Sequence, residues 1–415
     1  MCNPIDSTAT TPSLSSLVAH FEGLPDPRIN RTKDHKLLDL LVIAICTLLC
    51  GGESFNDMEE FGKAKLDWFK TFLELPQGIP SHDTFNRLFA ALNPQQFLDC
   101  FLRWTQSLRT AIAGEIVAID GKALRRALNR GQSAKYIVNA WAHQNGLVLG
   151  QLKVADKSNE ITAVPELLRA LELAGCIVTV DAMGCQKKIA KEIVEADADY
   201  VLALKGNQET VHQEVKSYLD DAIARQTHRL PPKSPAGAIP ELDYTETIEK
   251  DHGRMEIRRY WHSDRLAWFA DLGKWEKLTS VGVVESVREV TGETKIERRY
   301  YLSSLPRGAQ RFAMAVRGHW GVENQLHWVL DVCFGEDQSR ARTGYAAENL
   351  ATLRRLALNI LRRETTKKRG IKGKQKCAGW DHSYLLRLLG LYPQNSNLNH
   401  PAESTPIKNR QNQCD

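Results

Sequence analysis

Three short apolar runs in the middle of the chain constrain its fold more than any other feature. Residues 116–120 read Ile-Val-Ala-Ile-Asp, residues 176–181 read Cys-Ile-Val-Thr-Val-Asp, and residues 200–204 read Tyr-Val-Leu-Ala-Leu. Helical periodicity lies between them, at 165–174 and at 187–196. Strands that are apolar on both faces and alternate with helices belong to a sheet that helices cover on both sides. The sequence therefore predicts an α/β core.

The segments around this core have other periodicities. Residues 16–112 read as an all-helical module, with an apolar helix at 36–50 that Gly51-Gly52 ends and a helix that Ser81 caps. Residues 136–154 predict a hairpin, because Asn145-Gly146 is a strong turn signal. Residues 244–260, 280–290 and 294–302 alternate with a period of two, which indicates antiparallel strands, and helical character returns over 307–359.

Three segments have the composition of tails or linkers. Residues 1–15 are rich in Ser, Thr and Pro, so we expect a disordered tail there. The Pro-rich stretch 231–237 predicts a linker or loop. We expect 363–415 to be a basic, partly disordered tail. The stretch 362–376 holds eight basic residues and one acid, and could be a nucleic-acid arm or a soluble linker.

Composition excludes some classes of protein and leaves others open. Hydrophobic residues make up 42% and charged residues 25%, which is ordinary for a globular chain. The longest apolar stretch, 37–50, is too short to cross a bilayer, and the first residues show no secretion signal. The nine cysteines form no CxxC pair, which fits a reducing compartment, so we expect a cytoplasmic protein. A net charge of +5 permits nucleic-acid binding without demonstrating it.

Two acids stand at corresponding places in the predicted sheet. Asp120 and Asp181 each end an apolar strand, and the carboxyl ends of such strands are where α/β proteins build sites. Two carboxylates brought together there repel each other unless a hard cation such as Mg²⁺ lies between them. The structural alternative is that Asp120 is a turn residue and Asp181 a helix cap. For the pair, we weigh the two interpretations equally.

A second group of candidate residues lies on a predicted helix. His319, Glu323 and His327 are four residues apart and so share one helical face. That face could hold zinc, or Glu323 could join the two aspartates in an oxygen-only site for two metal ions, which suits phosphodiester displacement. The structural alternative hydrogen-bonds these groups in a core that also buries Trp320 and Trp328.

Basic and aromatic residues follow the candidate acids. Such residues could hold backbone phosphates and stack on unpaired bases, although each cluster alone could equally be a solvated face. They are Lys122, Arg125 and Arg126 after Asp120; Lys187, Lys188 and Lys191 after Asp181; and Arg254, Arg258, Arg259, Tyr260, Trp261, Arg298, Arg299, Tyr300 and Tyr301 on the predicted β segment.

Several ordered motifs make the chain resemble a known family. They include Phe21-Glu22-Gly23-Leu24-Pro25-Asp26-Pro27-Arg28, Pro80-Ser81-His82-Asp83, Ala118-Ile119-Asp120-Gly121-Lys122, Asp181-Ala182-Met183-Gly184, Leu204-Lys205-Gly206-Asn207-Gln208, His252-Gly253-Arg254, Tyr301-Leu302-Ser303-Ser304-Leu305, His319-Trp320-Gly321-Val322-Glu323-Asn324 and Phe334-Gly335-Glu336-Asp337. Over about residues 17–362, the chain resembles the bacterial insertion-sequence DDE transposases of the ISAs type, also called H-repeat-associated proteins.

The resemblance implies a fold and a set of catalytic residues. It implies an RNase H-like (retroviral-integrase-like) catalytic core over 113–362, with a β-rich insertion at about 207–306, and a DNA-binding role for the N-terminal helical domain. The catalytic acids would be Asp120, Asp181 and Glu323, holding two Mg²⁺ ions for which Mn²⁺ can substitute. The implied reaction is phosphodiester cleavage and strand transfer at the ends of an insertion sequence.

The resemblance also implies partners and contact residues. The partners would be double-stranded DNA, as terminal inverted repeats and target, and a second copy of the chain in a synaptic complex at the bacterial nucleoid. The implied DNA-binding residues are Lys122, Arg125, Lys187, Lys205, Arg254, Arg317, His319, Trp320 and Asn324. The sequence departs from the Tyr-Arg-Glu-Lys signature of related transposases, because Val316, His319 and Leu330 stand where Tyr, Arg and Lys would lie. Arg317 or His319 could take over the phosphate contacts.

Three rival functions remain open on the sequence alone. The chain could be a catalytically silent or repurposed DNA-binding protein derived from a transposase. It could be an RNase H-like nuclease that cuts without end specificity. It could also be a zinc hydrolase built on the helix that carries His319 and His327.

Overall fold

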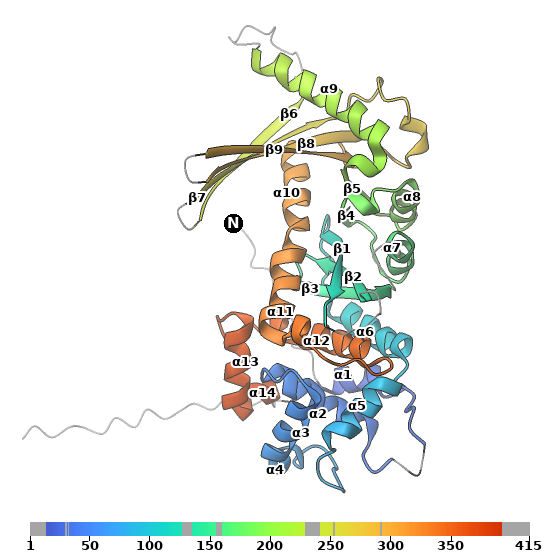
Figure 1. Ribbon diagram of the computed structural model, residues 1–415, viewed down its shortest axis with the longest axis vertical. Coiled ribbons are helices and arrows are strands. Elements are labelled where there is room, and N and C mark those ends of the chain that lie inside the picture. The colour runs from blue at the N-terminus through green and yellow to red at the C-terminus, as the bar shows by residue number, and fades with distance from the viewer. Residues whose placement is uncertain are drawn as a thin grey trace, which may run out of the picture.

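A computed structural model gives the architecture of the chain (Figure 1). It describes residues 14–29, 31, 33–126, 135–154, 160–228, 241–251, 254–290 and 293–391. Most of the tail expected at 1–15, the whole linker expected at 231–237, and residues 392–415 lie outside the described residues.

The N-terminal part of the chain is helical, as its periodicity predicts. The helices are α1 (Leu14–Phe21), α2 (Leu37–Leu49), α3 (Phe55–Ala64), α4 (Leu66–Phe69), α5 (His82–Ala91) and α6 (Pro94–Leu108). Side chains at the N-caps set where three of them begin: Ser54, Ser81 and Asn93 accept backbone N–H groups of α3, α5 and α6. The helices predicted at 36–50 and from Ser81 onward are confirmed.

Nine strands of the described chain form one mixed sheet in the order β3-β2-β1-β4-β5-β9-β8-β7-β6. Strand β1 is parallel to β4, and β4 to β5, whereas the other neighbours pair antiparallel. The strands are β1 (Ile116–Leu124), β2 (Lys135–Ala142), β3 (Leu147–Val154), β4 (Ile177–Val180), β5 (Asp199–Leu204), β6 (Asp243–Asp251), β7 (Arg254–Ser263), β8 (Ser280–Val290) and β9 (Glu293–Ser303). The predicted hairpin is confirmed as β2 and β3.

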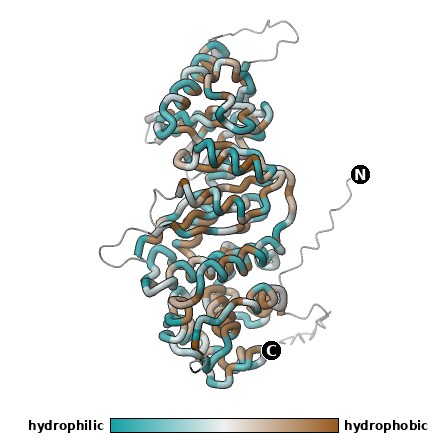
Figure 2. The backbone as a smooth tube through the Cα atoms, turned by 90° about the vertical axis from the view of Figure 1, so that its right-hand side faces the viewer, coloured by the Kyte–Doolittle hydropathy of each residue, from teal (hydrophilic) through white to brown (hydrophobic). Residues whose placement is uncertain are grey.

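Helices cover both faces of the parallel strands, as predicted. Ile177 and Val201 pack with Phe312 and Ala315 of α10 (Ala309–His319) on one face. On the other face, Val178 belongs to the main core together with residues of α7 (Glu160–Arg169) and α8 (Lys187–Glu195). In Figure 2 the apolar stretches concentrate in these central strands and in the helices below them.

The region expected to be β-rich from about 207 begins instead with a helix, α9 (Glu209–His228). Its strands do not form a separate layer, because β9 pairs with β5 and so extends the sheet of the core. The helix predicted over 165–174 lies earlier in the chain, over Glu160–Arg169, with Pro165 inside it.

The C-terminal region differs from the tail expected at 363–415. Helix α12 (Ala346–Arg363) is followed by α13 (Ile371–Trp380) and α14 (His382–Leu388). Lys374 of α13 is buried and its Nζ donates to the backbone oxygens of Leu361, at 2.8 Å, and Glu364, at the end of α12. These carbonyls have no partner within their own helix, so the lysine satisfies them and fixes α13 in place.

Helix α12 joins the N-terminal helices to the sheet. It packs against α2, α5 and α6 on one side and against β3 on the other. One hydrophobic core therefore runs from Leu17 to Leu389 through both regions. Among the described residues, no helix combines the length and the apolar character that crossing a bilayer requires.

A buried histidine predicts how the stability of this fold depends on pH. His262 of β7 is fully buried, stacks on Phe312 at 4.9 Å, and its Nδ1 accepts the N–H of Gly308 at 3.1 Å. Burial lowers the pKa of His262 to about 4. The unfolded chain therefore binds a proton more readily, and the stability due to neutral His262 is present above pH ~6.5 and is lost as the pH falls toward ~4.

We predict that, between pH 7 and pH 4.5, the free energy of unfolding of His262→Asn falls by about 2 kcal/mol less than that of the wild type. The asparagine oxygen can accept the same N–H but cannot titrate. Urea unfolding at the two pH values measures the difference. An equal loss of stability in the wild type and the variant would contradict the prediction.

Candidate active site

The pairing of β1 with β4 places two acids side by side. The last pair of their parallel ladder is Ile119 with Val180, and Asp120 and Asp181 follow directly. Neighbouring strands lie about 4.8 Å apart, and residues in register point to the same face of a sheet. Both side chains are half-buried. The two aspartates that the sequence singles out therefore come together on the face that α10 covers.

Asp120 does not end its strand, which differs from the expectation. Strand β1 continues to Leu124, because β2 goes on pairing with it after β4 has ended, and Asp120 lies opposite Asn139. One carboxylate oxygen of Asp120 accepts the N–H of Gly121 at 2.9 Å. The other lies 3.6 Å from Nδ1 of His327. The turn expected at Asp120-Gly121 is thus a continuation of the strand.

Asp181 ends β4 and caps the short 3₁₀ turn Ala182–Gly184, where its Oδ1 accepts the N–H of Gly184 at 3.2 Å. A Cβ at Gly184 would lie 2.1 Å from Val180, so only glycine allows the turn to fold back this tightly. The capping role considered from the sequence is therefore real. It occupies one carboxylate oxygen, and the described residues offer no hydrogen bond to the other.

A single helical column crosses the two aspartates. It consists of α10, a π-helical segment (Val322–His327) and α11 (Trp328–Phe334) (Figure 1). Before Glu323, His319 lies 2.9 Å from the hydroxyl of Thr179, two residues ahead of Asp181. After Glu323, His327 lies beside Asp120. Glu323 lies on the column between these two histidines, in a π-helical turn of the kind that often marks functional sites.

Two glycines let this column approach the sheet closely. A Cβ at Gly318 would lie 2.7 Å from Ile116, and a Cβ at Gly321 would lie 2.6 Å from Nδ1 of His143. Any side chain at either position would push the column away from the strands. The glycines thus set how closely the column that bears Glu323 approaches the sheet.

The two histidines of the column are neutral at neutral pH. Burial lowers the pKa of His319 to about 4, although the charge of Asp181 acts in the opposite direction. Burial, with the charges of Arg355 and Lys122, lowers the pKa of His327 to about 3. Both rings can therefore orient neighbouring groups by hydrogen bonds while adding no positive charge that would neutralise the aspartates.

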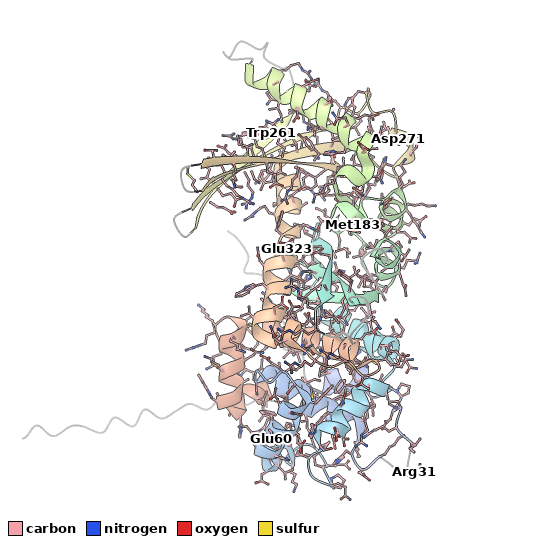
Figure 3. All side chains as sticks on the ribbon, viewed as in Figure 1. Arg31, Glu60, Met183, Trp261, Asp271 and Glu323 are labelled. Atoms are coloured by element: carbon pink, nitrogen blue, oxygen red, sulfur yellow. The ribbon has the colours of Figure 1, made fainter. Side chains whose placement is uncertain are left out.

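Glu323 is exposed (Figure 3) and is one of the residues that line a pocket of 250 Å³. The guanidinium of Arg299 stacks on the ring of Trp320, 4.6 Å from its centre, and Arg317 forms an ion pair with Glu249. Basic, aromatic and small residues of β7, β8, β9 and the column line the pocket: Arg258, Tyr260, Val284, Ser286, Arg288, Arg299, Tyr301, Val316, Arg317, Trp320, Glu323 and Asn324.

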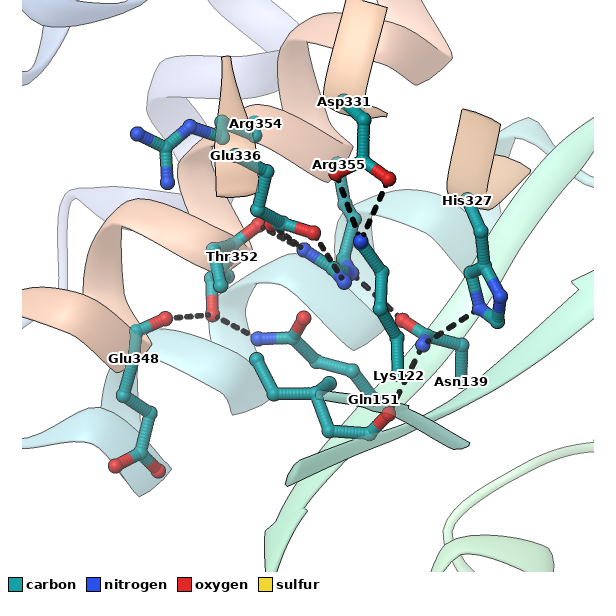
Figure 4. A network of polar contacts seen from close by, with 12 residues as sticks. Lys122, Asn139, Gln151, His327, Asp331, Glu336, Glu348, Thr352, Arg354 and Arg355 are labelled. Atoms are coloured by element: carbon teal, nitrogen blue, oxygen red, sulfur yellow. Dashed lines mark hydrogen bonds and ion pairs between the residues drawn. The ribbon is translucent and has the colours of Figure 1, made fainter. Parts of the chain in front are cut away.

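Lys122 has a structural role that differs from the predicted phosphate contact. Its side chain is only 7% exposed, and its Nζ lies 2.7 Å from a carboxylate oxygen of Asp331 (Figure 4) and 3.1 Å from one of Asp337. The lysine ties β1 to α11, and two carboxylates occupy its charge. It has no free position for a DNA phosphate in this arrangement.

Beneath this contact lies a buried ion pair that sequence reasoning missed. Arg355 of α12 and Glu336 are both fully buried and lie 2.7 Å apart. Arg355 also donates to the side chain of Asn139, 2.7 Å away, next to Asp120 (Figure 4). Burial acts to raise the pKa of Glu336, but the charges of Arg355 and Arg354 outweigh it and lower the pKa. Two arginines within the apolar helix were the signal that could have revealed this pair.

The other predicted DNA contacts lie at scattered places. Arg125 is exposed and lies 3.4 Å from Asp337, and Lys187 forms an ion pair with Asp271 at 3.0 Å. Lys205 follows β5 and is exposed, as is Asn324 beside Glu323. The side chain of Arg254 lies outside the described residues.

The donor set fits a hard cation in part. The carboxylates of Asp120 and Asp181 are oxygen donors of the kind that Mg²⁺ takes, and no described Lys or Arg forms an ion pair with Asp181. No group of three His, Cys, Asp or Glu side chains in the described ranges is gathered closely enough to hold a metal ion. Zinc gains no support, because His319 and His327 contact different partners.

Comparisons with known proteins agree on one family. Residues 18–105 match the family model described as DDE_Tnp_1-associated, and residues 113–360 match the model of the transposase DDE domain. The H repeat-associated candidate transposase YhhI of Escherichia coli (strain K12) is 38% identical over 383 residues, 91% of this chain and 98% of that protein. The candidate transposase YncI of Escherichia coli O157:H7 is 37% identical over 91% of this chain and 95% of its own length.

A solved structure shows only a distant similarity. The cryo-EM structure of the piggyBac transposase synaptic complex with hairpin DNA aligns with a TM-score of 0.41 at 12% identity, covering 95% of this chain and 80% of that chain. A TM-score this low does not establish a shared fold.

The buried ion pair yields a stability prediction. We expect Arg355→Met to destabilise the protein by about 3–5 kcal/mol, because it leaves Glu336 charged and unpaired in the core. The double variant Arg355→Met/Glu336→Gln should recover part of that loss. Arg363→Met, at the less buried end of the same helix, should change stability by less than about 0.5 kcal/mol. Urea unfolding measures all three, and additive effects in the double variant would contradict the prediction.

Proposed function

Because the chain belongs to the family of transposases with a DDE domain, we propose that it is a DNA transposase that cleaves and rejoins phosphodiester bonds at the ends of an insertion sequence. The observation that carries the proposal is the register of β1 and β4. It sets Asp120 and Asp181 side by side, under the column that bears Glu323. The two aspartates come from segments about 60 residues apart in the sequence and lie on one face of the sheet, and we propose that Glu323 joins them when DNA and metal bind.

The proposal includes an RNase H-like catalytic core. Its support is the arrangement of the first five strands, in which β3, β2 and β1 pair antiparallel and β4 and β5 continue parallel to β1. The β6–β9 strands and α9 would then be an insertion between β5 and the column that bears Glu323. The N-terminal helices would form the associated DNA-binding domain.

In the proposed site, Asp120, Asp181 and Glu323 would hold Mg²⁺, for which Mn²⁺ can substitute. When bound, the metal would supply charge stabilisation at the attacking and leaving oxygens of the phosphodiester. The neutral rings of His327 and His319 lie beside Asp120 and next to the Asp181 strand, where they would hold the column in position without weakening the negative potential. Because Glu323 lies exposed on the column, DNA would approach from its side (Figure 3).

The proposed partner is double-stranded DNA, as terminal repeats and as target, bound by two copies of the chain. Residues beside the site would contact it. They are Trp320 and Asn324 on the column side and Lys205 beyond the end of β5. Arg317 and Lys187 would contact phosphate only by exchanging their present partners, Glu249 and Asp271. Lys122 is left out, because Asp331 and Asp337 already occupy its charge.

A second candidate function is DNA binding without cleavage. One observation favours it, which is that the described residues gather no three potential metal ligands. Cleavage by the wild type would exclude it.

We predict that Asp120→Asn, Asp181→Asn and Glu323→Gln each lower the rate of Mg²⁺-dependent nicking at the DNA ends by at least about a hundredfold. The substitutions keep side-chain size but remove the charge. Asp221→Asn, on the exposed side of α9, is the matched control and should nick at the wild-type rate. Strand cleavage on labelled DNA that carries the flanking ends is the measurement. Activity at the wild-type level in any of the three variants would overturn that residue's assignment.

Metal binding can be tested without DNA. At a hundredfold excess over its dissociation constant, Mn²⁺ should stabilise the wild type by about 2.7 kcal/mol. Asp120→Asn/Asp181→Asn should show no metal-dependent rise in melting temperature, whereas Asp221→Asn should show the full rise. A rise in the double variant equal to that of the wild type would place the metal elsewhere.

A further inference from the structure

The composition of the stretch 362–376 suits either a nucleic-acid arm or a soluble linker. In the structure, its second part, from Ile371 onward, belongs to a helix that hydrogen bonds anchor to the rest of the protein. Helix α13 is anchored from below, since Lys374 caps the end of α12 and Gln375 donates to the backbone oxygen of Leu48 at 3.1 Å. Tyr384 donates to the carboxylate of Glu364 at 2.7 Å and holds the preceding turn. The outer surface of this segment is therefore fixed.

That outer surface is basic. Lys372, Lys376 and Trp380 are four residues apart on α13, so they follow one another along one face of the helix, and all three are exposed. The turn before the helix adds three more exposed cations. We name the whole set the α13 ridge: Lys367, Lys368, Arg369, Lys372, Lys376 and Trp380.

The cations of the α13 ridge differ from those around the acids in their partners. Arg317, Lys187 and Arg299 are each paired with a carboxylate. Within the described ranges, by contrast, no carboxylate forms an ion pair with Lys368, Arg369, Lys372 or Lys376. Their charge is therefore available to an outside partner. Trp380, which is 75% exposed, adds a large aromatic surface at the end of the row.

The ridge lies on the side of the molecule where Glu323 is exposed. Helix α13 packs beside α11, which continues the column that bears Glu323. Figure 3 shows Glu323 on the flank of that column, with α13 below it and the β6–β9 strands above. A long polyanion that reaches Glu323 along this flank would pass the ridge.

We propose that the α13 ridge binds the phosphate backbone of duplex DNA flanking the cleavage site, without reading its sequence. This inference rests on the proposed function, since it takes the same DNA as its ligand. Lys372 and Lys376 are separated by a helical rise of about 6 Å. DNA presents one phosphate per ~3.4 Å of axis on each strand, so both lysines can contact phosphates of a single strand. Fixed, unpaired cations in a row are what phosphate contacts require.

The test compares DNA binding by the full chain and by the variant Lys372→Gln/Lys376→Gln. The probe is a fluorescent duplex of about 40 base pairs and arbitrary sequence, and anisotropy is recorded over a series of salt concentrations. The slope of the logarithm of the association constant against the logarithm of the salt concentration is negative. Loss of two phosphate contacts should make it less steep by about 1.8 and weaken binding roughly tenfold at low salt. The charge-retaining variant Lys372→Arg/Lys376→Arg should bind like the wild type.

A matched control changes the net charge by the same two units elsewhere. Lys216 of α9 is exposed and forms no ion pair among the described residues, and α9 lies far from α13 (Figure 1), so Lys216→Glu should keep the wild-type slope. Circular dichroism melting of every variant separates a loss of contacts from a loss of fold. A slope unchanged in Lys372→Gln/Lys376→Gln, or made equally less steep in the control, would overturn the proposal.

Three further outcomes distinguish DNA from another ligand of the ridge, and the ridge proposal from the catalytic function. If the ridge variant loses binding to phosphatidylglycerol vesicles but keeps its DNA slope, the ridge recognises an anionic lipid surface and the proposal is wrong. If the wild type cleaves no DNA but the ridge variant has a less steep salt slope, the ridge stands and the proposed catalytic function fails. If the wild type cleaves DNA and the ridge variant binds it unchanged, the catalytic function stands and the ridge proposal fails.

Discussion

The parallel ladder between β1 and β4 fixes where the two aspartates lie relative to each other. It ends at Ile119 and Val180, so that Asp120 and Asp181 emerge from neighbouring strands at the same level. Three features around the site support this arrangement: the covering helices, two glycines and a buried ion pair. Helices cover both faces of the strands, and Gly318 and Gly321 let the column approach to within contact distance. The buried pair of Arg355 with Glu336 supports Asn139, the residue opposite Asp120. Both aspartate side chains are half-buried, and two carboxylates held side by side favour a cation between them.

The distribution of charged residues explains why the net charge of +5 does not indicate whether the protein binds a nucleic acid. Most cations near the candidate acids are neutralised within the molecule: Lys122 by Asp331 and Asp337, Lys187 by Asp271, and Arg317 by Glu249. Basic residues that follow a candidate acid in sequence are therefore not automatically free to bind phosphate. The α13 ridge shows the reverse case, in which a run that resembled a linker is anchored through buried Lys374 and exposes its remaining cations.

Local patterns predicted much of this architecture, and long-range contacts account for what they missed. Apolar runs at 116–120 and 176–181 predicted two strands of a covered sheet, and Asn145-Gly146 predicted the hairpin, because each depends on a few adjacent residues. The continuation of β1 beyond Asp120 depends on β2, and the burial of Lys122 depends on two acids more than 200 residues away, so neither could be read locally. Helix α13 was missed because the basic composition of 362–376 suggested an arm or a linker, whereas one buried lysine and one glutamine hold it against α12 and α2. Helix α14 lies in the region expected to be a partly disordered tail, and Tyr384 ties it to Glu364.

The central claim is that Asp120, Asp181 and Glu323 belong to one metal site when DNA is bound. Fe²⁺ in place of Mg²⁺ reduces added hydrogen peroxide to hydroxyl radical and hydroxide, ascorbate reduces the resulting Fe³⁺ back to Fe²⁺, and the radicals cut the polypeptide next to the bound ion. We predict three cuts in the DNA-bound protein, close to residues 120, 181 and 323, and their joint loss in Asp181→Asn. Cuts confined to one of these segments, or located elsewhere in the chain, would contradict it.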